Sequence, residues 1–206
     1  KKRNVQIVGI SMMTFQVLQT YYLVRELKKE GMIVVLGGPH PSDCPEECLQ
    51  NGCDIVVRNE GEETLRELCL YWKGQDSMPL GEIQGISYLD KNNKIISTPD
   101  RNRINLDTVP RPDFDIFDRA QFLNPDGLVK GVNRIYTSRG CPGRCTFCDW
   151  QVFGQKIRYY NLETVIDDIQ RRIDAFGVTS FNIADDCFTV NKRRVFSFVN
   201  TFKNGI

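Results

Sequence analysis

The sequence predicts an α/β protein: a partial doubly wound domain, followed by the first strand–helix units of a second α/β domain. Short, continuous apolar runs alternate with amphipathic segments over residues 1–75, and the alternation resumes from Val132. Strands that are apolar throughout are typical of a parallel sheet with helices on both faces. We therefore expect domains at 1–75 and 131–206, joined at 76–130 by a linker with a β-hairpin.

The N-terminal domain is expected to alternate strictly between strands and helices. Its strands are rich in Val and Ile, and its last helix has acidic residues in the first turn, as the helix dipole favours. In chain order, we expect a strand at Val5–Ile10, a helix at Phe15–Lys29, a strand at Met32–Leu36, a short helix around Glu46–Gln50, a strand at Asp54–Val57 and a helix from Asn59 through Trp72.

The middle of the chain has a different pattern. Ile83–Leu89 and Lys94–Thr98 flank the polar residues Asp90–Asn93, which favours a hairpin. Several prolines and many charges follow it, as in an ordered but irregular connection. This segment is the predicted domain junction.

Strand–helix alternation then resumes. Val132–Thr137 is a predicted strand that leads into a cysteine-rich loop, and Leu162–Phe176 is a helix with one apolar stripe, ended by Gly177. Thr179–Ala184 and Lys192–Lys203 are the next strand and helix. Two such units cannot close a barrel, so we expect the sequence to be cut at its C-terminal end.

The composition is that of an ordinary globular protein. The formal net charge is +1 and 41% of the residues are hydrophobic, with no polybasic patch that would favour nucleic acid. No apolar stretch is long enough to cross a membrane, and the first residues lack the apolar core of a signal peptide. We expect a cytoplasmic protein, in which eight cysteines are more often metal ligands or buried thiols than disulfides.

One cysteine cluster has the spacing of a metal site. Cys141, Cys145 and Cys148 follow the pattern C-x3-C-x2-C in a loop with Gly140 and Gly143. Thiolates are the usual ligands of iron–sulfur clusters, and three of them leave one iron of a four-iron cluster open to a substrate. A zinc site or three buried thiols is the alternative; zinc would need a fourth ligand, such as Cys187.

This loop resembles the C-x3-C-x-aromatic-C signature of the radical S-adenosylmethionine (SAM) superfamily, with Phe147 at the aromatic position. The resemblance implies that residues 131–206 are the first part of a (β/α) partial TIM barrel. It also implies a 4Fe-4S cluster whose open iron binds SAM and whose electron cleaves it to a 5′-deoxyadenosyl radical. Phe147, Asp149 and Trp150 become candidate SAM-binding residues.

Asp185 and Asp186 end the second predicted strand of this barrel. Barrel enzymes place active-site groups at the carboxyl ends of strands. The resemblance implies that one of these two carboxylates binds the amino group of SAM. The alternative is that one of them caps the following turn.

The N-terminal half resembles the later part of the cobalamin-binding domain of one radical SAM class. By that resemblance Ser11, Gly37 and Gly38 line a cleft for the nucleotide tail of cobalamin. Small residues at the ends of parallel strands let a bulky ligand approach the backbone. The Asp-x-His-x-x-Gly loop usual in that class is absent, so either the N-terminal part is missing or cobalamin never bound through a histidine. The single histidine, His40, is interpreted as a turn residue bonded to a neighbour rather than a metal ligand.

Other residues fit simpler explanations. Cys44, Cys48 and Cys53 have the spacing C-x3-C-x4-C, but they span a loop, a helix and a strand, so they are interpreted as buried free cysteines, like Cys69. Tyr159, Tyr160 and Trp150 could stack on a substrate, although packing is the more common role of such aromatics.

The resulting hypothesis is a cobalamin-dependent radical SAM enzyme that methylates or rearranges a small molecule or peptide. Its partners would include a reductant such as flavodoxin or ferredoxin, and neither nucleic acid nor membrane. Three alternatives stay open: a radical SAM enzyme without cobalamin, an iron–sulfur electron carrier, and a non-catalytic zinc-binding or scaffold fragment. The sequence gives neither the substrate nor the oligomeric state.

Overall fold

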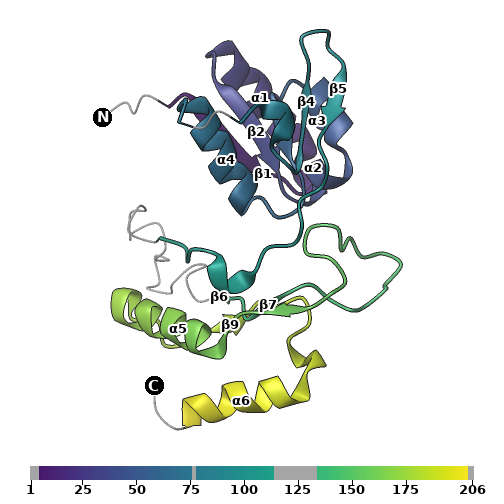
Figure 1. Ribbon diagram of the computed structural model, residues 1–206. Coiled ribbons are helices and arrows are strands. Elements are labelled where there is room, and N and C mark those ends of the chain that lie inside the picture. Colours follow the sequence, from purple (N-terminus) through teal and green to yellow (C-terminus); the bar gives the residue numbers. More distant parts are fainter. Residues whose placement is uncertain (1–4, 76–77, 114–133, 204–206) are drawn as a thin grey trace. The chain divides into compact units, whose positions relative to one another are not determined.

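The computed structural model describes residues 5–75, 78–113 and 134–203 (Figure 1). It divides into two compact units, each described by itself. The first unit comprises Lys1–Arg103 together with the segment Thr146–Phe153.

A five-stranded mixed sheet lies at the centre of the first unit. Its strand order is β1-β2-β3-β4-β5; the pairs within β1–β3 are parallel, and the pairs from β3 to β5 are antiparallel. Ser11 pairs with Gly37, so that β1 and β2 end side by side. The strands are β1 (Ile7–Ser11), β2 (Ile33–Gly37), β3 (Ile55–Val57), β4 (Ile86–Leu89) and β5 (Ile95–Ser97).

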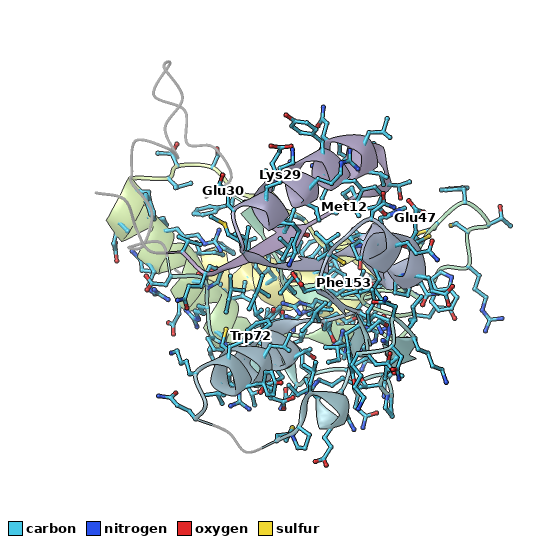
Figure 2. The ribbon with its side chains drawn as sticks, turned by 90° about the horizontal axis from the view of Figure 1, so that it is seen from above. Met12, Lys29, Glu30, Glu47, Trp72 and Phe153 are labelled. Atoms are coloured by element: carbon cyan, nitrogen blue, oxygen red, sulfur yellow. The ribbon has the colours of Figure 1, made fainter. Side chains whose placement is uncertain are left out.

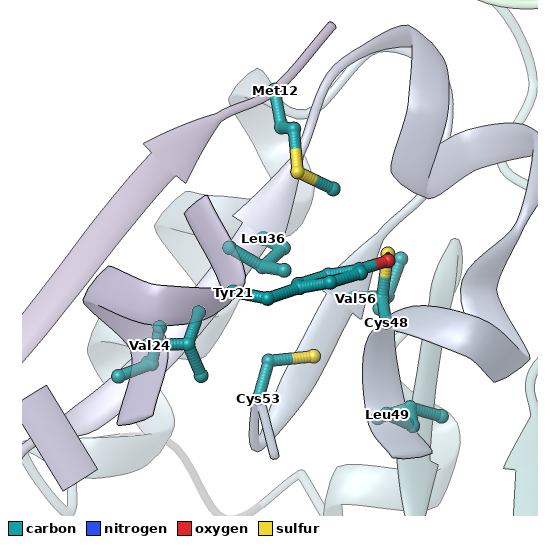
Figure 3. Close-up of a cluster of buried hydrophobic side chains, with 9 residues drawn as sticks. Met12, Tyr21, Val24, Leu36, Cys48, Leu49, Cys53 and Val56 are labelled. Carbon is teal, nitrogen blue, oxygen red and sulfur yellow. The ribbon is translucent and has the colours of Figure 1, made fainter. Parts of the chain in front are cut away.

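Helices cover both faces of this sheet, which confirms the doubly wound arrangement. Successive residues of β2 alternate between two apolar clusters: Val34 and Leu36 pack with α1 and α3 (Figure 3), whereas Val35 packs with α4 on the other face. Both clusters are closed to solvent at their centres, as expected for strands without polar alternation. The helices are α1 (Val17–Lys29), α2 (Pro39–Asp43), α3 (Pro45–Gln50) and α4 (Glu62–Trp72).

The sheet is mixed, whereas the sequence indicated a parallel one. The hairpin β4–β5, which the sequence analysis assigned to the linker, pairs with β3, and Ile86 joins the α4 cluster. A buried cation reinforces this pairing: the Arg58 guanidinium donates to the carbonyl of Ile86 at 2.5 Å, to Ser87 Oγ at 2.6 Å and to the carbonyl of Thr98. The apolar hairpin thereby covers an edge of β3 that would otherwise face water.

The second unit comprises Ile104–Cys145 and Gly154–Ile206. Its centre is a strand–helix–strand arrangement in which β6 and β9 pair in parallel and α5 connects them. A second pair, β7 with β8, is antiparallel. The elements are β6 (Arg134–Ile135), β7 (Ser138–Arg139), β8 (Arg158–Tyr159), α5 (Leu162–Phe176), β9 (Asn182–Ile183) and α6 (Lys192–Lys203).

Helix α5 matches its prediction closely. Asn161 caps its first turn by accepting the N–H of Glu163, and Gly177 ends it in the left-handed region at φ 65°. Its apolar stripe, with Val165 and Ile169, packs on Ile135 and on Phe198 of α6. The period of 3.6 residues therefore identified both the helix and the face that it buries.

No barrel is evident among the residues that the structure describes, and the described part of the second unit is an α/β arrangement. The described part of the second unit contains a single parallel pair, joined over two residues of each strand. Two strands and one connecting helix have no interior to enclose. Within the described ranges, no helix is long and apolar enough to cross a membrane.

Candidate functional site

The cysteine loop follows β7, and Gly140 fixes its starting point. Gly140 has φ +92°, and a Cβ there would lie 2.6 Å from the Lys156 carbonyl oxygen and 2.9 Å from that of Gly154. Neither oxygen can move aside easily, because both belong to the backbone. The N–H of Cys141 also donates to the Gly154 carbonyl at 3.2 Å. The chain before the first cysteine is thus pressed against residues 154–156.

Two of the three predicted ligands gather around Gly143. A Cβ added to Gly143 would lie 3.3 Å from Cys141 Sγ and 3.8 Å from Cys145 Sγ, so both sulfurs face a position without a side chain. The N–H of Gly143 donates to Cys141 Sγ at 3.4 Å. Hydrogen bonds to the sulfurs of an iron–sulfur cluster help to set its reduction potential. These donors suit an iron–sulfur cluster.

The third predicted ligand, Cys148, belongs to the segment Thr146–Phe153 of the first unit. There it lines a cavity of about 340 Å³ that also contains the three residues expected to bind SAM. Phe147 is 90% exposed, so its ring is available to a ligand. The lining residues are Asp43, Thr146, Phe147, Cys148, Asp149, Trp150 and Gln151.

Two carboxyl groups meet at this cavity. Burial raises the pKa of Asp43, and the neighbouring Asp149 carboxylate, which also hydrogen bonds with it, raises that pKa further. Asp149 itself accepts the N–H of Gln151 at 2.8 Å and so forms a local turn. The sequence did not point to Asp43, which is distant in the chain and has no motif around it.

Asp185 is a structural acceptor as well as a predicted SAM ligand. Its two oxygens accept four hydrogen bonds: from the N–H groups of Thr137 and Ser138 at 2.6 and 3.1 Å, and from their hydroxyls at 2.6 and 2.7 Å. Thr137 and Ser138 are buried. The carboxylate therefore fixes the residues just before the cysteine loop to the end of β9.

Asp186 has a different partner from Asp185, at the start of the cysteine loop. Its Oδ2 accepts the N–H of Gly140 at 3.1 Å. Both predicted aspartates thus contact residues 137–140: Asp185 contacts Thr137 and Ser138, and Asp186 contacts Gly140. The sequence analysis did not connect Thr137 and Ser138 with Asp185, although two adjacent hydroxyl residues at a strand end are a usable signal.

Arg194 of α6 is a further residue that the sequence analysis did not identify. Its guanidinium donates to the carbonyls of Thr137 and Tyr160 at 3.1 and 2.6 Å and lies over the Tyr159 ring at 4.7 Å. Burial lowers its pKa, although nearby Asp185 opposes that shift. Tyr159 and Tyr160 accordingly have packing roles here.

The residues predicted for cobalamin lie together at the carboxyl ends of β1 and β2. The N–H of Met12 donates to the Gly37 carbonyl at 2.8 Å. Gly38 has φ +97°, and a Cβ there would lie 2.8 Å from Ser11 Oγ. Ser11 is exposed, and a Cβ on Gly9 would meet nothing within 4 Å. This open backbone edge suits the approach of a large ligand.

Comparison with known proteins agrees with this arrangement. Residues 1–69 match the B12 binding domain family. The chain is 36% identical to an uncharacterised methyltransferase, PH0819 of Pyrococcus horikoshii, over 94% of this chain and 42% of that protein. It is 26% identical to the cytidylyl-2-hydroxyethylphosphonate methyltransferase of Streptomyces wedmorensis, over 98% of this chain and 44% of the relative.

A solved structure is also similar. The cobalamin-dependent S-adenosylmethionine radical enzyme OxsB with aqua-cobalamin bound matches with a TM-score of 0.69 and 27% identity, over 89% of this chain and 26% of that chain. The chain thus spans less than half the length of the relatives that it matches.

Proposed function

We propose that the chain binds a 4Fe-4S cluster through its cysteine loop and cleaves SAM reductively. The match of residues 1–69 to the B12 binding domain family and the similarity to a cobalamin-dependent radical SAM enzyme support this proposal. The ligands are Cys141, Cys145 and Cys148. The observation that carries the proposal is the convergence of the first two sulfurs over Gly143. The relatives that are methyltransferases support radical methylation as the overall reaction, with a small molecule or a peptide as substrate.

The loop residues have distinct roles in this proposal. The three thiolates would hold three irons of the cluster and leave the fourth open to SAM, and the bound cluster would supply the electron for cleavage of a C–S bond of SAM. The Gly143 N–H stabilises negative charge on Cys141 Sγ. Gly140 keeps the loop against residues 154–156 and so limits the positions that the thiols can take.

The two aspartates divide into a positioning residue and a ligand. Asp185 already accepts four hydrogen bonds, so we assign it the positioning of Thr137 and Ser138. Asp186 accepts the N–H of Gly140 through Oδ2 and is our candidate for the amino group of SAM. Phe147, Asp149 and Trp150, which share a cavity with Cys148, are our candidates for the adenosine part.

The first unit would bind cobalamin at the ends of β1 and β2. Ser11 offers a hydroxyl at the surface, and Gly37 and Gly38 keep the adjacent backbone free of side chains. We propose that β6, α5 and β9 are the first part of a barrel, and that the partners are a flavodoxin- or ferredoxin-type reductant and the substrate, without nucleic acid or membrane.

The test is anaerobic reconstitution of the chain with iron and sulfide, followed by electron paramagnetic resonance with and without SAM. We expect a reduced four-iron signal that changes when SAM is added. Cys145→Ala should abolish it, whereas Cys69→Ala, which removes an exposed cysteine of α4, should leave it unchanged.

The other outcomes separate the alternatives. A four-iron signal that does not respond to SAM would indicate an electron carrier. Zinc in place of iron and sulfide after anaerobic purification, lost in Cys145→Ala but kept in Cys69→Ala, would contradict the proposal and indicate a structural zinc site in the cysteine loop. Retention of the four-iron signal by Cys145→Ala would refute the ligand assignment.

A further inference from the structure

A second set of metal-ligand side chains lies in the first unit, on α2 and α3. The ligand atoms of His40, Cys44 and Glu47 lie within 4.8 Å of one another. We propose that these three residues form a binding site for a transition-metal dication such as Zn²⁺ or Co²⁺. The site is independent of the cluster proposed at Cys141, Cys145 and Cys148.

The local backbone explains why the three side chains meet. Pro39 begins α2, the Cys44 N–H donates to the His40 carbonyl at 2.9 Å, and the Cys48 N–H donates to the Cys44 carbonyl at 3.2 Å. Cys44 itself is not helical, at φ −123° and ψ 54°, and marks the junction between α2 and α3. The two bonds hold the end of α2 and the start of α3 together at Cys44, with His40 in α2 and Glu47 in α3. The three ligand atoms therefore meet at the junction between these two short helices.

The donors match the preferences of zinc in type and distance. Histidine nitrogen, cysteine thiolate and carboxylate oxygen bind zinc at about 2.0–2.3 Å, which places tetrahedral ligands about 3.4–3.7 Å apart. His40 Nε2 and Glu47 Oε1 are already 3.7 Å apart. The remaining contraction is of the order of 1 Å. Three protein ligands leave the fourth position to water.

Tyr21 of α1 orients these ligands. Its hydroxyl donates to Glu47 Oε1 at 3.0 Å and lies 3.5 Å from both His40 Nε2 and Cys48 Sγ; Figure 3 shows the hydroxyl directed at Cys48. Metal ligands are commonly held by such outer hydrogen bonds.

The site also has an entry path. The His40 side chain is 8% exposed, whereas that of Glu47, labelled in Figure 2, is 47% exposed. An ion could therefore reach the buried imidazole from the Glu47 side. His40, which the sequence analysis interpreted as a turn residue bonded to a neighbour, would then be a ligand.

Co²⁺ is the probe for this site, because a thiolate bound to Co²⁺ gives a charge-transfer absorption band. The full chain carrying Cys141→Ala, Cys145→Ala and Cys148→Ala is titrated, so that the cysteine loop cannot contribute. We expect one Co²⁺ per chain, with the band present, and displacement of the Co²⁺ by Zn²⁺. Tyr21→Phe should weaken binding about 10- to 100-fold.

Matched variants identify the ligands in the same background. Cys44→Ser should abolish the thiolate band, whereas Cys69→Ser should keep it. Glu47→Gln should weaken binding, whereas Glu46→Gln, an exposed neighbour on α3, should not.

Circular dichroism checks that each variant is folded. A folded chain without a thiolate band, or a band that persists in Cys44→Ser, would overturn the proposal and leave a hydrogen-bonded group of Tyr21, His40 and Glu47. Neither result depends on whether the iron–sulfur cluster forms, because its three ligands are absent from every protein tested.

Discussion

Replacing Asp185 with alanine should loosen the chain immediately before the cysteine loop. The substitution removes the acceptor of four hydrogen bonds from Thr137 and Ser138. The two hydroxyls can rotate toward other acceptors, but the two backbone N–H groups cannot. Both residues are at most 2% exposed, so water cannot easily replace the carboxylate.

The expected cost follows from those two N–H groups. A buried donor left without a partner costs about 1–3 kcal/mol, which gives about 2–6 kcal/mol for the pair. Folded domains are stable by only about 5–15 kcal/mol, so the change is a large fraction of the total. Asp186→Ala removes one bond to a backbone N–H and should cost about 1–3 kcal/mol.

Hydrogen exchange measured by mass spectrometry tests the loss of amide protection next to the cysteine loop. Urea unfolding measures the change in the free energy of unfolding of the whole chain. Peptides covering 134–140 should lose protection in Asp185→Ala, while the amides of Thr137 and Ser138 stay protected in Asp186→Ala. Iron loading of the reconstituted chain should fall with the loss of protection. Unchanged exchange of these amides in a folded Asp185→Ala protein would refute the assigned positioning role.

Three further predictions concern other parts of the structure. Gly140→Ala should reduce iron loading and destabilise the chain by about 1–3 kcal/mol, because the added Cβ would lie 2.6 and 2.9 Å from two backbone carbonyl oxygens. A Gly140→Ala variant with wild-type iron loading and stability would contradict this prediction. Burial raises the pKa of the Cys53 thiol, whereas Cys69 is exposed. At mildly alkaline pH, iodoacetamide should therefore modify Cys69 and spare Cys53 until the chain unfolds, as measured by mass spectrometry of the peptides. The raised pKa of Asp43 means that wild-type stability falls as pH rises from the ordinary Asp range through that pKa; Asp43→Asn should therefore melt at a higher temperature at neutral pH, with no gain at acidic pH, and an equal gain at both would exclude the effect of Asp149.

Periodicity predicted the elements well, because local burial decides them. Val34, Val35 and Leu36 are all buried, on alternate faces, and this is why β2 reads as a continuous apolar run. The apolar stripe of α5 and the glycine that ends it, Gly177, could also be predicted from the sequence. Which strands pair with each other could not be predicted, because a hairpin such as β4–β5 has the same local pattern whether it stands alone or extends a sheet.

The candidate site was predictable as a motif but not as a set of contacts. The spacing of the cysteines predicts them as cluster ligands, and this stays a prediction. The structure adds how Gly140 lies against residues 154–156 and how two of the sulfurs lie beside Gly143. The acceptor role of Asp185 depends on partners 47 and 48 positions away, which no local pattern contains. The grouping of Tyr21 with His40 and Glu47 is missed for the same reason, since it joins α1 to α2 and α3.

The contact between Asp185 and Thr137 also orders events during synthesis of the chain. A ribosome releases the three loop cysteines well before it releases Asp185, and a contact of long sequence separation forms late in folding. Until β9 pairs with β6, Thr137 and Ser138 lack the Asp185 carboxylate and are held by the pairing of β7 with β8 and by the bond from the Tyr160 N–H to the Thr137 carbonyl. The cysteines therefore pass through a period as thiols in a loop whose start is only partly fixed. Under the proposed function, assembly of an iron–sulfur cluster would follow the pairing of β9 with β6.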